Sequence, residues 1–271
     1  MNKTFNRRRL AYATYNKRMS YLQDISSIKQ QYREWFGVAR SQLETQFAQL
    51  REDFACPDCD KEAASVTSPD IPNHENPMPD ITRPTHPGCG YRPWQEAVKA
   101  YLIQDVGFKI NHQLAAIVDQ RNVQGQCHMC GVCCKLASSE FSFETLKQKA
   151  QAGDEFARQF TSIFVPYESI DDVQAEFPDL VADMLSQTEL KDVHFYHCPY
   201  LGQDNRCTIY NDPRRPKICD EYPQTPLTLM YKNCGYQPWR TAQLPAMLMA
   251  HATLELCTYY VDKIDSALNA S

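Results

Sequence analysis

Cysteines are concentrated in one part of this chain, and any fold must accommodate them. Eight of the twelve cysteines in 271 residues fall between Cys127 and Cys234. A chain of this length can bury a core large enough to fold without disulfides, so we expect these thiols to serve local chemistry. Eight thiols are enough for two sites of four thiolates each, which is the kind of site that binds zinc or an iron–sulfur cluster. The candidate ligands are Cys127, Cys130, Cys133, Cys134, Cys198, Cys207, Cys219 and Cys234.

The first four of these cysteines form a compact motif, Cys127-His-Met-Cys130-Gly-Val-Cys133-Cys134. Gaps of two residues allow successive backbone turns to point sulfur atoms at a common centre, and the run begins as the ferredoxin pattern does. Here, however, the fourth cysteine directly follows the third. Adjacent Cα atoms are about 3.8 Å apart, which is less than the ~4.4–6.8 Å usual for a disulfide. The motif therefore predicts either two adjacent metal centres that share this loop, or one centre with an extra thiol beside it.

A second metal site is predicted outside this group. Cys56 and Cys59 have the two-residue gap of a metal knuckle or a redox pair. Cys89 begins the hexapeptide Cys-Gly-Tyr-Arg-Pro-Trp, which recurs as Cys-Gly-Tyr-Gln-Pro-Trp from Cys234; in each copy Pro and Trp are suited to open a helix and anchor it in a core. We expect Cys56, Cys59 and Cys89 to share a site. Cys234 is a candidate for its fourth ligand, although it is also a candidate ligand of the main group. Alternatively, the repeat marks two similar helix starts in which the cysteines are incidental.

The remaining sequence predicts a mostly α fold with a small β-hairpin, an α+β domain stapled by metal and preceded by a long amphipathic helix. Apolar residues at steps of three and four predict this helix over residues 15–50, either continuous or broken near Gly37. Strands are expected at residues 193–197 and 207–210, joined by a turn at residues 202–205. Further helices are expected over residues 94–122, 143–164 with a break near Gly153, 171–186 and 241–268.

Prolines separate the two ends of the chain. Eight of its seventeen prolines lie in residues 52–93, which disfavours regular structure there. We therefore predict a helical segment over residues 1–53, a proline-rich arm over residues 54–93 and a cysteine-cluster domain over residues 94–271. The first helix is expected either to pack on the rest of the chain or to bind a protein partner.

Composition excludes several classes of protein. Arginines at positions 7–9 are not followed by the apolar stretch of an export signal, and no run of about 18 apolar residues predicts a membrane span. The net charge of −5 argues against nucleic-acid binding. The expected compartment is the cytoplasm, where thiols stay reduced and clustered cysteines more often bind metal.

The cysteines stand in a set of short motifs: Cys127-x2-Cys130-Gly-x-Cys133-Cys134, Cys198-Pro-Tyr-Leu201, Cys207-Thr-Ile-Tyr210, Arg215-Pro-x-x-Cys219, Tyr222-Pro223 and Cys234-Gly. With these residues the chain resembles the CxxCxxCC family of zinc- or iron-chelating domains, the YkgJ-like cysteine-cluster proteins. Asp220 stands where an arginine is common in the family, an extra residue precedes Arg215, and the first 93 residues have no counterpart. The resemblance implies metal binding, and some relatives carry such a domain on flagellin lysine N-methylases.

The leading prediction is a metal-binding protein, holding zinc or an iron–sulfur cluster, with a structural, redox or metal-handling role. The alternative is an enzyme whose catalysis the cluster supports, by methyl transfer or oxidoreduction. The sequence contains no glycine-rich nucleotide loop and no H-E-x-x-H motif that would support an enzyme. A third class, a secreted disulfide protein, is disfavoured because no signal peptide is recognised.

Overall fold

The structure is a computed structural model that describes residues 25–54, 81, 85, 88–178, 181–182, 193–228 and 234–270. The chain divides into two compact units. The cysteine unit comprises residues 1–29 and 117–244, and the helical unit comprises residues 30–116 and 245–271. Each unit is defined by the contacts between its own residues. The three domain ranges predicted from the sequence stay a prediction.

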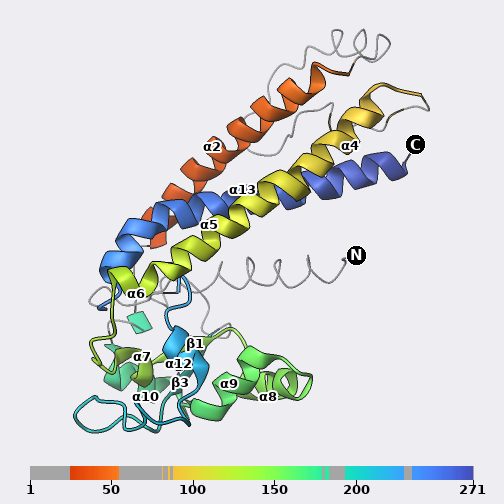
Figure 1. Ribbon diagram of the computed structural model, residues 1–271. Coiled ribbons are helices and arrows are strands. Elements are labelled where there is room, and N and C mark those ends of the chain that lie inside the picture. The colour runs from red at the N-terminus through yellow and green to blue at the C-terminus, as the bar shows by residue number, and fades with distance from the viewer. Residues whose placement is uncertain are drawn as a thin grey trace. The chain divides into compact units, whose positions relative to one another are not determined.

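The helical unit is formed by long helices (Figure 1). In α2, residues Ala39, Leu43 and Phe47 recur at four-residue steps, which places them on one face of the helix, and all three are buried. The ring of Phe47 packs edge-on against that of Tyr260, with centroids 5.0 Å apart. The predicted long N-terminal helix is therefore confirmed from Ile25 onward, and its apolar face packs in the unit's own core. The helices that contribute are α2 (Ile25–Arg51), α4 (Tyr91–Tyr101), the π-helical turn η1 (Leu102–Val106), α5 (Gly107–Asp119) and α13 (Gln237–Asn269).

Gly37 does not break α2, which runs without interruption from Ile25 to Arg51. Glycine inside a helix costs roughly 0.5–1 kcal/mol relative to alanine, because it loses more backbone freedom on folding. A Cβ added at Gly37 would have no atom within 4 Å. We therefore expect Gly37→Ala to raise the free energy of unfolding of the helical unit by about 0.5–1 kcal/mol, measurable by urea denaturation followed by circular dichroism. A lower stability would show that α2 needs a flexible residue at this position.

The two copies of the hexapeptide each open a helix, as the sequence predicts. Trp94 in α4 and Trp239 in α13 are both fully buried. The indole N–H of Trp94 donates to the carbonyl of Phe47 at 3.0 Å, and that of Trp239 donates to the carbonyl of Ile117 at 2.8 Å. In each copy the tryptophan therefore anchors the start of its helix to a second helix of the same unit.

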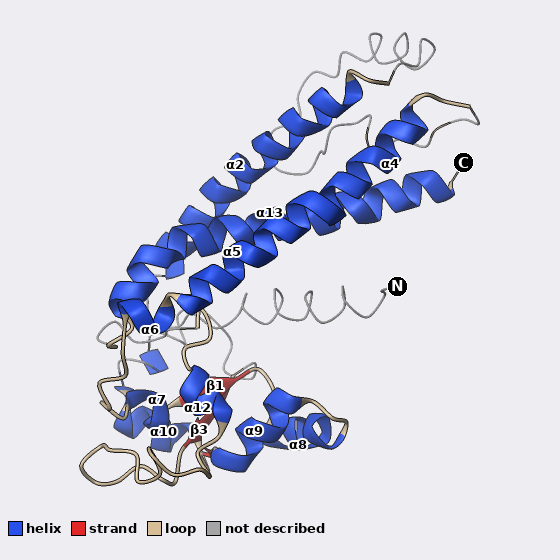
Figure 2. Ribbon diagram, viewed as in Figure 1, coloured by secondary structure: helices blue, strands red, loops and turns tan. Residues whose placement is uncertain are grey.

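The cysteine unit contains a three-stranded antiparallel sheet and several short helices around it (Figure 2). The strands are β1 (Ala137–Ser139), β2 (Val165–Pro166) and β3 (His194–His197), in the order β1-β3-β2. Ser138 pairs with Phe195, and Val165 pairs with His197. The helices are α6 (Arg121–Gln124), α7 (Val132–Lys135), α8 (Phe143–Gln151), α9 (Glu155–Ile163), α10 (Ile170–Glu176) and α12 (Lys217–Glu221).

The predicted break near Gly153 is confirmed, and local side chains explain it. The hydroxyl of Ser142 accepts from the backbone N–H of Thr145 and begins α8. Gly153 has a φ of +91°, which glycine adopts without strain. The carboxylate of Asp154 then accepts from the N–H of Ala157 and begins α9. The chain therefore turns sharply between two capped helices.

The fold class is confirmed as mostly helical with a small antiparallel β element, but the predicted hairpin pairing is wrong. Residues 194–197 form β3, whereas its partners are β1 and β2. Residues 207–210 form no strand, and Cys207 makes a single isolated bridge with Leu201. The physical reason is that Pro199 lacks the N–H that would continue the ladder, and turns at residues 202–205 hold the next segment close to Tyr200.

The helices predicted over residues 94–122 and 241–268 are present, the first interrupted by η1 and the second starting earlier, at Gln237. The helix predicted over residues 171–186 is shorter than expected: α10 ends at Glu176, and Phe177, which precedes Pro178, leaves the helical conformation. Residues 179–180 and 183–186 lie outside the described ranges. Among the described helices, none has the length and apolar character needed to cross a bilayer.

Candidate metal centre

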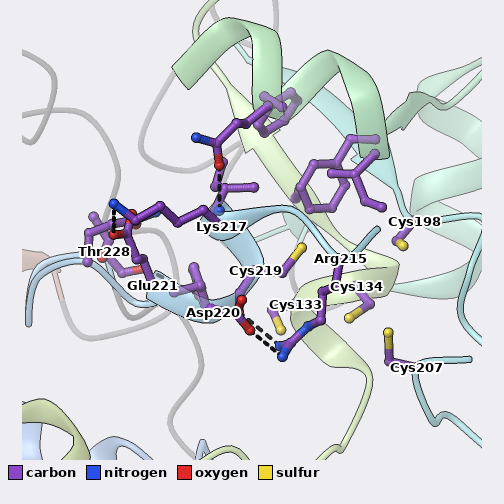
Figure 3. A pocket seen from close by; sticks show the side chains of 18 of the residues that line it. Cys133, Cys134, Cys198, Cys207, Arg215, Lys217, Cys219, Asp220, Glu221 and Thr228 are labelled. Carbon is purple, nitrogen blue, oxygen red and sulfur yellow. Dashed lines mark hydrogen bonds and ion pairs between the residues drawn. The ribbon is translucent and has the colours of Figure 1, made fainter. Parts of the chain in front are cut away.

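The cysteine unit contains a cavity of about 780 Å³, and all eight cysteines predicted as the main ligand group line it. Five of their sulfur atoms, those of Cys133, Cys134, Cys198, Cys207 and Cys219, appear together in Figure 3. The ten cysteines that the structure describes form no disulfide. Segments more than a hundred residues apart in the sequence therefore bring thiols to one cavity.

These thiols line the cavity without meeting at a point. Within the described ranges, no three side chains of His, Cys, Asp or Glu are already arranged to hold one metal ion. Zinc–sulfur bonds are about 2.3 Å long, so metal binding would require the thiols to close inward. The donor set itself fits zinc and iron, because soft thiolates are the ligands that zinc and iron–sulfur clusters select.

Gly131 shapes the loop that carries the first four cysteines. Its φ of +75° is favourable for glycine, and a Cβ there would lie 2.9 Å from the carbonyl oxygen of Asn205. The carbonyl of Gly131 accepts from the N–H groups of Cys134 and Lys135, at 3.0 and 2.9 Å. Gly131 thus begins α7 and allows this loop to pack against the turn that precedes Cys207.

Backbone hydrogen bonds place Cys134, Cys198 and Cys207 near one another. The N–H of Cys198 donates to the carbonyl of Cys134 at 2.7 Å. Leu201 donates to the carbonyl of Cys198 and also forms the β-bridge with Cys207. The chain that leaves β3 therefore returns Cys207 to the neighbourhood of Cys198, although without the predicted hairpin.

A second backbone crossing places Cys127 near Cys234. The N–H of Gln126 donates to the carbonyl of Gly235 at 3.3 Å. A Cβ at Gly235 would lie 2.0 Å from the carbonyl oxygen of Gln126 and 2.8 Å from the His128 ring. Glycine at position 235 is therefore required for the close approach of the two segments.

Burial and neighbouring groups shift the pKa values of the thiols in opposite directions. Burial raises the pKa of Cys198 to about 11 and that of Cys219 to about 12. The hydrogen bond between Cys133 and Cys134 lowers the pKa of Cys134 to about 7, with help from the charge of Arg215, and raises the pKa of Cys133. Because metal ligands are thiolates, binding at the buried thiols must release protons.

Arg215 is a cation that lies beside the thiols of Cys134 and Cys219. Its side chain is 15% exposed and pairs with Asp220 at 2.5 Å, a contact visible in Figure 3. It also donates to the carbonyl of Cys219 at 3.1 Å and stacks on the ring of Tyr210, 4.3 Å from its centroid. Asp220 therefore holds in place a cation that can offset thiolate charge.

Two other cations near the cysteines pair with carboxylates: Arg214 with Asp212 at 2.7 Å, and Lys217 with Glu221 at 3.0 Å.

Of the two histidines that directly neighbour a cysteine in the sequence, His128 lines the cavity. The ring of His197 packs against Tyr167, with centroids 5.0 Å apart.

One wall of the cavity is aromatic, which the sequence did not predict. Phe156 and Phe160 of α9, Phe164 directly after it, and Phe141 all line the cavity. Rings of Phe160 and Phe164 have centroids 4.7 Å apart. The signal was present as an apolar stripe of a predicted helix, but such a stripe is usual for any core helix.

Of the four residues of the predicted second site, the structure describes Cys89 and Cys234. Cys56 and Cys59 lie outside the described residues. Cys89 is buried in the hydrophobic core of the helical unit together with Tyr91 and Trp94, whereas Cys234 lines the cavity of the cysteine unit. A shared site of Cys56, Cys59 and Cys89 stays a prediction. Cys257 is also buried in the core of the helical unit.

The comparisons with known proteins agree with the position of this cavity. The chain matches no curated protein and no solved structure. A family model described as "CxxCxxCC: Putative zinc- or iron-chelating domain" matches residues 126–241. This range includes every cysteine that lines the cavity, so the part of the chain that is similar to this family is the part that forms the cavity.

Proposed function

We propose that this protein binds zinc or iron through the thiols of its CxxCxxCC domain, with the eight cavity cysteines as the ligand group. The observation that carries the proposal is that eight cysteines from separate segments line one cavity. Buried thiols of a purely structural kind have no reason to gather in this way, whereas metal ligands must. A bound metal would supply either a structural cross-link or, as an iron–sulfur cluster, redox chemistry.

The chain's own residues define what such a metal would experience. Arg215 supplies positive charge beside the thiols of Cys134 and Cys219, and its pairing with Asp220 fixes its position. Groups of this kind orient metal ligands and tune their charge. We further propose a cytoplasmic location, because clustered thiols that bind metal need a reducing compartment.

The metal content of two matched cysteine variants tests this proposal. Cys198 and Cys257 are both buried, but Cys198 lines the cavity whereas Cys257 lies in the core of the helical unit. We expect Cys198→Ser to lower bound metal at least twofold and Cys257→Ser to leave it unchanged. Elemental analysis of anaerobically purified protein measures the content, and its visible absorption distinguishes zinc from iron–sulfur. Equal metal content in both variants, or none in the wild type, would refute the proposal.

A second candidate function is an enzyme in which the metal supports methyl transfer or oxidoreduction. The observation that favours it is the volume of the cavity, about 780 Å³, which is within the range of about 300–1,000 Å³ typical of small-molecule sites. Its aromatic wall could hold an apolar substrate against the thiols. A small aromatic molecule that alters the visible spectrum of the metal-loaded protein would distinguish this candidate from a purely structural site.

A further inference from the structure

The cavity cysteines fall into two sets with different surroundings. We name the first set, Cys127, Cys130, Cys133 and Cys234, the exposed set after its two solvent-exposed members, Cys127 and Cys130; its other two members are partly buried. The second set, Cys134, Cys198, Cys207 and Cys219, is named the buried set, because Cys198 is buried and the other three are partly buried. All four members of the buried set belong to or pack against one hydrophobic cluster that contains Leu146, Phe160 and Tyr196. In the part of the chain that the structure describes, that cluster includes no cysteine of the exposed set. Cys127 and Cys130 are instead exposed to solvent.

Backbone contacts follow the same division. The hydrogen bond from Cys198 to Cys134 and the bridge between Leu201 and Cys207 connect segments that carry the buried set. The crossing of Gln126 and Gly235 connects segments that carry the exposed set. Each set is therefore assembled by its own local contacts.

The division falls between two consecutive residues of one helical turn. Cys133 and Cys134 both lie in α7, where successive residues point about 100° apart. One side chain can thus face the exposed loop while the next faces the hydrophobic cluster. Two adjacent cysteines of one helical turn can therefore serve different centres.

The side chains of Cys133 and Cys134 are hydrogen-bonded to each other. These two cysteines therefore form the link between the sets.

We propose that the CxxCxxCC domain of this chain holds two four-thiolate metal centres joined at Cys133 and Cys134, one exposed and exchangeable and the other buried and retained. This inference rests on the metal binding proposed above and adds the number of centres and their different roles. The buried centre lies beside Arg215 and the hydrophobic cluster, so it would act as a structural staple. The exposed centre is open to solvent, so it would exchange metal with small chelators or with another protein.

Zinc stoichiometry and release kinetics of the full chain test the two-centre proposal. Metal-free protein is loaded with Zn²⁺ under reducing conditions, and bound zinc is counted after removal of the excess. We expect two zinc ions per chain and two phases of release to a coloured chelator, with rates at least tenfold apart. One zinc ion per chain, or a single release phase, would overturn the two-centre inference while leaving metal binding intact. If the protein binds no added zinc, and the protein as purified contains neither zinc nor iron, the proposed function is overturned.

A matched pair of variants assigns the phases. Cys130→Ser changes the exposed set and should remove the fast phase and one zinc ion. Cys207→Ser changes the buried set and should remove the slow phase and one zinc ion. If both variants lose the same phase, the division into these sets is wrong. The wild-type stoichiometry and kinetics need no variant, so the proposal stays testable even if Cys207→Ser does not fold.

Discussion

Removal of metal is expected to make residues 127–234 sensitive to protease while the helical unit stays protected. Binding to the native site contributes directly to the free energy of folding, about 10–16 kcal/mol for zinc in small zinc-finger peptides. The cysteine unit has short helices and a sheet of three short strands, so its segments depend strongly on such a contribution. The helical unit has a continuous core around Phe47, Trp94 and Tyr260, to which no cavity cysteine contributes.

Limited proteolysis with mass spectrometry, with and without a strong chelator, measures this difference. We expect cleavage between Cys127 and Cys234 to accelerate at least a hundredfold on metal removal, and cleavage within α2 and the end of α13 to change by less than a factor of three. Metal re-addition should restore protection, which excludes irreversible oxidation of thiols as the cause. Equal protection of both units in both conditions would mean that metal contributes nothing to folding.

What the sequence could predict depends on how local each signal is. The break at Gly153 is set by a few adjacent residues, and the structure confirms it. The two-residue gaps of the Cys127 motif are equally local, and the thiols that they space line one cavity. The hexapeptide repeat likewise predicted two helix starts because Pro and Trp act within one turn. In each of these cases the physical cause lies within about ten residues of its effect.

The misinterpreted features depend on contacts between distant segments. The strand signal at residues 194–197 is real, but its partners β1 and β2 are three and two residues long and too short to give a periodic pattern. Arg215 could not be separated from neighbouring cations by sequence, because its distinction is burial among Tyr210, Cys219 and Asp220. The division of the thiols into two sets likewise depends on which of them meets the hydrophobic cluster, and this is decided by tertiary packing.

Gly235→Ala is expected to weaken metal binding as strongly as loss of a ligand, although it changes no ligand. The added methyl carbon would lie 2.0 Å from the backbone oxygen of Gln126 and 2.8 Å from the ring of His128. Backbone atoms cannot move aside without separating the two segments that carry Cys127 and Cys234. Overpacking of this kind typically costs about 1–3 kcal/mol, which corresponds to a loss of roughly 5- to 150-fold in an equilibrium constant.

Gly153→Ala is the matched control for this variant. Gly153 has a φ of +91°, so alanine there is strained, at a cost of roughly 1–2 kcal/mol, yet its Cβ would have no atom within 4 Å. It should therefore lower thermal stability and leave zinc affinity, measured by competition with a chelator of known affinity, within about twofold of the wild type. Gly235→Ala should lower that affinity at least tenfold. If both variants bind zinc as the wild type does, the crossing of Gln126 and Gly235 does not position Cys127 and Cys234, and the exposed set loses the contact that assembles it.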